Sequence, residues 1–105
     1  MPTKTIPVLA DDVMFRFLGS DEDSLLRGSV LVRDGEIVLD IPGGYGPYLI
    51  VGKPRLHWYE GTNSATARRF EVSATWANVG ESYVGRWIEA NHEYLFSFVL
   101  GSSTT

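Results

Sequence analysis

The residues able to carry acid–base or metal chemistry are few. The chain has two histidines, His57 and His92, thirteen acidic residues and no cysteine. A zinc or iron site would have to combine both histidines with acids such as Glu60, Glu71 or Glu89. No H-x-H or H-x-x-x-E spacing joins such residues locally. We therefore expect no metal site and no cofactor.

Catalytic patterns are equally scarce. No G-x-S-x-G segment is present, so no serine sits in the turn that α/β-hydrolases use. Glu60, Glu71, Glu89 and Glu93 could supply the two carboxylates of a glycoside hydrolase, which must face each other across a cleft. Each of the four is also typical of a strand end or an outward strand position. We expect a protein without enzymatic activity, with a paired-carboxylate hydrolase as the remote alternative.

Residues that could bind a ligand are more numerous than residues that could carry out catalysis. Residues 83–98 hold five aromatic rings and one arginine, Arg86, which lies between glycine and tryptophan. An arginine on an apolar strand face must reach an anion or solvent. Arg86 could hold the carboxylate of a ligand in an apolar cavity. It could instead reach the rim, or pair with an acidic side chain of a neighbouring strand or subunit. The expected ligand-binding residues are Arg86, Trp87, Tyr83, Trp58 and Phe98.

These residues need β-strands to position them. In residues 70–76, Phe70, Val72, Ala74 and Trp76 alternate with polar residues, the period of a strand with one buried face. Residues 26–42 predict a hairpin, because Asp34 and Gly35 suit a type I′ turn. The predicted pairs are Arg33 with Glu36, Val32 with Ile37, Leu31 with Val38, Val30 with Leu39 and Ser29 with Asp40.

Residues 83–100 predict a second hairpin. A turn centred on Asn91 and His92 would pair Trp87 with Phe96 and Gly85 with Phe98. A three-residue loop would instead place Glu89 opposite Glu93, and like charges repel. In the preferred register both faces of the hairpin are apolar, and the reverse face holds Val84, Ile88, Leu95 and Val99.

The remaining segments complete an all-β pattern. Residues 47–53 and 55–60 predict two strands broken at Lys53 and Pro54. Residues 13–19 favour a strand over a short helix, because Val13, Phe15 and Phe17 alternate with other residues. We predict a small antiparallel meander barrel or barrel-like sandwich of about seven to eight strands. Residues 1–105 would form a single β domain, with 1–6 and 101–105 loosely ordered.

The composition indicates which classes of partner the protein is not expected to bind, namely nucleic acid and membrane. The net charge is −4, and acids gather at residues 11–12 and 21–23, which would repel a nucleic-acid backbone. No apolar run approaches the roughly 20 residues of a membrane helix. The first residues show no secretory signal pattern, so we expect a cytoplasmic protein that contacts neither nucleic acid nor membrane.

Two functions follow from the doubly apolar hairpin. One face of a packed sheet forms the core, so the other must line a cavity or contact another chain. The first hypothesis is a small β-barrel that binds a small apolar or anionic ligand inside. The alternative is a homo-oligomeric protein-interaction module that uses the C-terminal hairpin as its interface.

Overall fold

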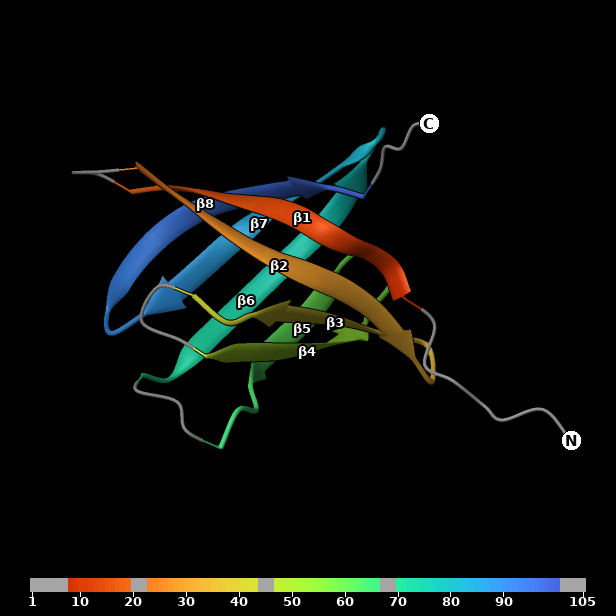
Figure 1. Cartoon of the computed structure of the whole chain (residues 1–105), viewed down its shortest axis with the longest axis horizontal. Coiled ribbons are helices and arrows are strands. Elements are labelled where there is room, and N and C mark those ends of the chain that lie inside the picture. The colour runs from red at the N-terminus through yellow and green to blue at the C-terminus, as the bar shows by residue number, and fades with distance from the viewer. Residues whose placement is uncertain (1–7, 20–22, 44–46, 67–69, 101–105) are drawn as a thin grey trace, which may run out of the picture.

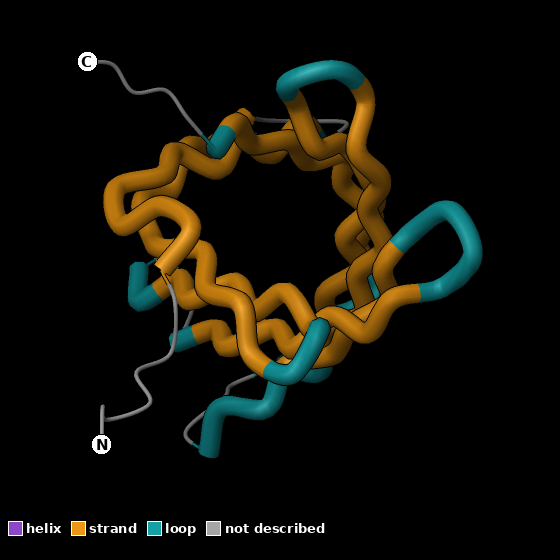
Figure 2. The backbone as a smooth tube through the Cα atoms, turned by 90° about the vertical axis from the view of Figure 1, so that its right-hand side faces the viewer, coloured by secondary structure: helices purple, strands orange, loops and turns teal. Residues whose placement is uncertain are grey.

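The protein is a closed antiparallel barrel in which each strand pairs with its neighbours in sequence order (Figure 1). The structure, a computed structural model, describes residues 8–19, 23–43, 47–66 and 70–100. Seen from its end, the backbone forms a continuous ring of strands (Figure 2). The strands are β1 (Val8–Leu18), β2 (Asp23–Arg33), β3 (Glu36–Ile41), β4 (Tyr48–Pro54), β5 (Tyr59–Asn63), β6 (Val72–Val79), β7 (Ser82–Glu89) and β8 (His92–Val99).

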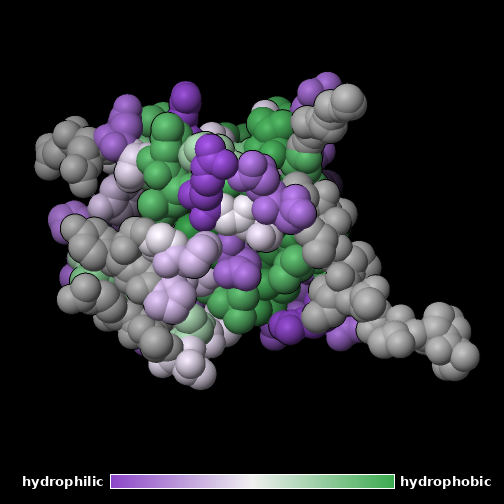
Figure 3. Space-filling model, viewed as in Figure 1, coloured by the Kyte–Doolittle hydropathy of each residue, from purple (hydrophilic) through white to green (hydrophobic). Residues whose placement is uncertain are grey.

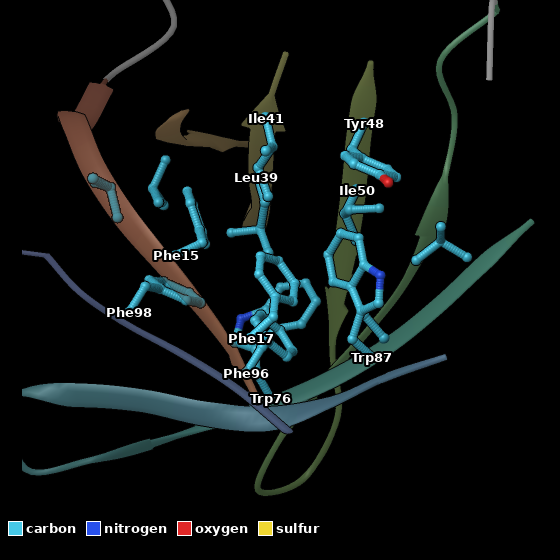
Figure 4. Close-up of a cluster of buried hydrophobic side chains, with 14 of the residues drawn as sticks. Phe15, Phe17, Leu39, Ile41, Tyr48, Ile50, Trp76, Trp87, Phe96 and Phe98 are labelled. Carbon is cyan, nitrogen blue, oxygen red and sulfur yellow. The ribbon is translucent and has the colours of Figure 1, made fainter. Parts of the chain in front are cut away.

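Large side chains fill the described interior of this ring. Alternate residues of each strand point inward, as the period of two requires. The fully buried ones with the largest volume include Trp76, Trp87, Phe15 and Phe96. Trp76 and Trp87 both pack edge-to-face on Phe96, and Phe15 packs at a tilt on Phe98 (Figure 4). The core is therefore a cluster of aromatic rings with Leu39, Ile41 and Ile50 beside them.

Two glycines allow the sheet to bend tightly around these rings. A Cβ at Gly52 would collide with the six-membered ring of Trp76, so the indole occupies the space that a side chain on β4 would take. A Cβ at Gly85 would collide with the backbone of Thr75 and Trp76 on β6. Missing side chains at such positions let strands curve and close into a barrel.

The β2–β3 hairpin confirms the predicted register. Arg33 pairs with Glu36 and Ser29 with Asp40, with the other three predicted pairs between them. Asp34 and Gly35 both have positive φ, at 54° and 79°. This is the backbone of a type I′ turn, whose twist matches that of the two strands.

The predicted register of the β7–β8 hairpin is wrong by two residues. The turn lies at Ala90 and Asn91, which have φ of 51° and 70°, so Glu89 pairs with His92. Trp87 therefore pairs with Tyr94, and Gly85 with Phe96. The prediction did not consider a turn at Ala90, where a positive φ is unfavourable because the residue has a Cβ. A shift of two residues keeps every side chain on its predicted face.

Other segments differ in extent. Residues 13–18 lie in β1, as the alternation predicts. The strand predicted over residues 55–60 begins only at Tyr59, and residues 55–58 form the connection from β4. The predicted loose order of residues 1–6 and 101–105 lies outside the described residues. The described chain contains no helix long and apolar enough to cross a membrane.

Candidate functional site

The predicted ligand-binding residues separate into two groups. Tyr83, Trp87 and Phe98 point into the barrel, where Trp87 and Phe98 are 1% and 2% exposed. Tyr83 stacks on Phe98 with the ring centroids 5.0 Å apart. Burial raises the pKa of the Tyr83 phenol above 10.0, with a smaller contribution from Tyr59. Trp87 and Phe98 therefore belong to the packed interior, and the partly buried Tyr83 packs against it.

Arg86 and Trp58 form the second group, on the outside. The Arg86 side chain is 69% exposed, and its Nε lies 3.4 Å from a carboxylate oxygen of Glu93 on β8. Of the two expectations for Arg86, the structure shows the pairing with an acid on a neighbouring strand. An ion pair this exposed contributes little to stability.

A polar network missed by the sequence analysis lies inside one end of the barrel. Glu89 accepts hydrogen bonds from the Tyr48 hydroxyl at 2.7 Å and from Nε1 of Trp87 at 2.9 Å. Tyr48 and Trp87 lie together in the buried cluster (Figure 4), on the opposite side from Phe15 and Phe98. The aromatic donors belong to β4 and β7, so only the closed fold brings them together. The network gives two buried donors a charged acceptor.

The outside of β1, β2, β7 and β8 carries a broad apolar surface. We call it the outer apolar face; it comprises Met14, Leu18, Leu25, Val84, Ile88, Leu95 and Val99. These side chains are between 41% and 57% exposed. They are neighbours across the strands, since Leu18 pairs with Leu95 and Val84 with Ser97. In the view of Figure 3, hydrophobic residues reach the surface between hydrophilic ones.

A hollow of about 370 Å³ lies within this face. Its lining includes Leu18, Val84, Arg86, Leu95 and Ser97. The contribution of β7 and β8 could be predicted from the sequence, because both faces of that hairpin are apolar. Met14, Leu18 and Leu25 could not be recognised in this way, because they join the face only when β1, with β2 paired beside it, closes the barrel against β8.

A second hollow region, the β6 trough, follows the outside of β6. Its floor consists of the outward residues Ser73, Thr75 and Ala77, which are small. One part, of about 360 Å³, includes Lys53, Arg55, Glu60 and Thr62. The other, of about 280 Å³, includes Trp58, Val84 and Arg86, and both parts contain Thr75. The fold thus brings Trp58 and Arg86 to one hollow, outside the barrel.

The described residues hold no group of three histidine or acidic side chains placed to bind a metal ion. No family model, curated protein or solved structure matches the chain. The geometry of the outer apolar face and of the β6 trough is therefore the basis for any assignment.

Proposed function

We propose that this barrel is a non-catalytic interaction module that associates with a second copy of itself through the outer apolar face. The observation that carries the proposal is the exposure of seven large apolar side chains on neighbouring strands of a barrel with a packed interior. Together they present roughly 500–600 Å² of apolar surface, the upper end of what a monomeric protein ordinarily exposes.

The area of this face suits a homodimer. A stable interface buries about 800 Å² on each partner. The outer apolar face approaches that size once the polar residues within it, such as Ser97 and Arg16, are included. Covering the apolar side chains removes them from water, and this is the dominant favourable term in association.

The charges of the face favour a second copy as the occupant. Arg16 and Arg86 point outward here, and Glu93 and Asp23 lie beside them, so the face is neutral although the protein carries −4. Within the described residues Arg16 has no ion-pair partner. A two-fold axis presents the same surface to itself, so the acids of one copy can approach the arginines of the other.

A ligand inside the barrel is the second candidate function, and one observation favours it. Nε1 of Trp76 is buried, and no acceptor among the described residues bonds it. An acceptor atom of a ligand would satisfy that donor. A thermal-shift screen with fatty acids and retinoids tests this candidate, and an unchanged melting temperature with every compound would eliminate it.

Size-exclusion chromatography with light scattering, run over a hundredfold range of protein concentration, tests the homodimer. We expect the mass to approach twice 11.7 kDa at high concentration. Leu95→Lys places a third positive charge between Arg86 and Leu18, so we expect that variant to stay monomeric at concentrations where the wild type is dimeric.

Leu56→Lys is the matched control. Leu56 is 83% exposed and lies in the β4–β5 connection, which contributes no residue to the outer apolar face, so its replacement should leave the dimer intact. A wild type that remains monomeric up to millimolar concentration contradicts the proposal. So does a Leu95→Lys variant that associates as strongly as the control.

A further inference from the structure

We infer that the β6 trough is a carbohydrate-binding site for a neutral oligosaccharide, with Trp58 as its aromatic platform. The trough borders the proposed dimer contact, because Val84 and Arg86 line both its nearer part and the hollow of the outer apolar face. Trp58, Arg55 and Glu60, on which the inference rests, are not part of that face, so the inference can be tested separately from the homodimer.

The walls and floor of the trough are set by the strand register. Glu60 on β5 pairs with Thr75 on β6, and Thr75 pairs with Arg86 on β7, so these three side chains cross the barrel in one outward row. In the adjacent row, Thr62 pairs with Ser73. Small side chains on β6 between larger ones on β5 and β7 leave an open channel with hydroxyl groups on its floor.

Trp58 is held in place at one end of this channel. Of the three tryptophans, Trp76 and Trp87 are 1% exposed, whereas Trp58 is 41% exposed. Arg55 donates a hydrogen bond from Nε to Oε1 of Glu60 at 2.8 Å, and the Arg55 backbone N–H donates to the Trp58 carbonyl at 2.6 Å, while the indole of Trp58 contributes to lowering the pKa of Glu60. An exposed indole restrained by a carboxylate loses little side-chain entropy when it binds a ligand.

Two of the three cations along the trough, Arg55 and Arg86, are paired with acids within the protein, and Lys53 is the third. Hydrogen bonds from Arg55, and then from Trp58, lower the pKa of Glu60 below its usual 4.5, so the carboxylate is ionised at neutral pH. Its charge is balanced by Arg55, and that of Arg86 by Glu93. Such pairs exert little net attraction on an ion. Their remaining lone pairs and N–H groups can still bond neutral hydroxyls.

A sugar ring matches this combination of surfaces. One face of a pyranose presents C–H groups, which pack on an aromatic ring, and its edge presents hydroxyls, which are both donors and acceptors. Glu60 supplies acceptor oxygens, Arg55 and Lys53 supply donors, and Thr62 and Thr75 supply either. The two parts of the trough, of about 280 and 360 Å³, have together the size of a typical ligand site. Because the trough is open and consists of two adjoining parts, it suits a chain of sugars better than a single sugar ring.

Native gels cast with soluble polysaccharides test the inference. The neutral probes are dextran, a β-glucan, xylan and mannan, and polygalacturonate is the charged comparison. We expect at least one neutral polysaccharide to reduce the protein's mobility at least twofold. The same polysaccharide should protect tryptophan fluorescence from quenching by acrylamide, because Trp58 is the exposed indole.

Variants at exposed positions keep the test independent of folding. Trp58→Ala should abolish the mobility change, and Trp58→Phe should retain part of it because a ring face remains. Leu56→Ala, two residues away and also exposed, should behave as the wild type. Equal retardation of Trp58→Ala and wild type overturns the inference, as does the absence of retardation by all four neutral probes. Retardation by polygalacturonate alone, lost in salt, identifies an anion site and overturns it as well.

Discussion

At the residue scale, Glu89 is the side chain that joins two buried aromatic rings by hydrogen bonds. Its two oxygens accept hydrogen bonds from Tyr48 and Trp87, which are 3% and 1% exposed. Buried donors lose their water on folding, so a protein acceptor must replace it. Glu89 thus allows two large amphipathic rings to complete the core at one end of the barrel.

Replacing Glu89 by leucine should therefore destabilise the protein strongly. We expect Glu89→Leu to lower the free energy of unfolding by about 2–4 kcal/mol, because both rings lose their carboxylate acceptor. Glu89→Gln should have a smaller effect, since its amide oxygen can still accept one of the two bonds. Urea denaturation followed by circular dichroism measures both.

The control for this prediction is Glu81→Leu. Glu81 is exposed in the turn between β6 and β7, so its replacement should change the free energy of unfolding by less than about 0.5 kcal/mol. If Glu89→Leu matched that small change, the carboxylate would not be the acceptor on which Tyr48 and Trp87 depend.

At the element scale, local turn chemistry determines how well a register can be predicted. Asp34 and Gly35 are the preferred residues of a type I′ turn, and the β2–β3 register was predicted correctly in every pair. Ala90 and Asn91 form the same kind of turn without glycine. Nothing in the local sequence indicates that alanine adopts a positive φ there. Packing of β7 and β8 into the barrel determines it.

That strain makes Ala90 a site for stabilisation. Ala90 has a φ of 51°, a conformation that glycine adopts without steric penalty. We expect Ala90→Gly to raise the free energy of unfolding by up to about 1 kcal/mol, measured by urea denaturation. Ala77→Gly, within β6, should instead lower it by about 0.5–1 kcal/mol. A loss of stability in Ala90→Gly would contradict the assigned turn.

At the scale of the whole molecule, barrel closure is what the sequence could not determine. Alternation predicted the inward direction of Phe15, Phe17 and Trp76, and their burial confirms it. Pairing of β1 with β8 depends on residues about 80 positions apart, for which no local pattern exists. The outer apolar face and the β6 trough both follow from closure, so only part of each was recognisable from the sequence.

Closure also depends on a short ladder. β1 and β8 are joined by three residue pairs, Arg16 with Ser97, Phe17 with Phe96 and Leu18 with Leu95. The β7–β8 ladder, in contrast, has eight pairs. A short ladder opens more readily than a long one, because fewer hydrogen bonds and packed side chains must separate. The β1–β8 seam is therefore one place where the barrel should open locally, together with the β5–β6 ladder, which has four pairs.

The proposed dimer contact covers this seam, because Leu18 and Leu95 belong both to the seam and to the outer apolar face. Association should then protect the seam. We expect backbone amides of Arg16–Leu18 and Leu95–Ser97 to exchange with deuterium at least tenfold more slowly at millimolar than at micromolar protein concentration. Amides of β3, which contributes no residue to the face, should not change. Leu95→Lys should remove the concentration dependence, and equal protection at both concentrations would show that no partner covers the seam.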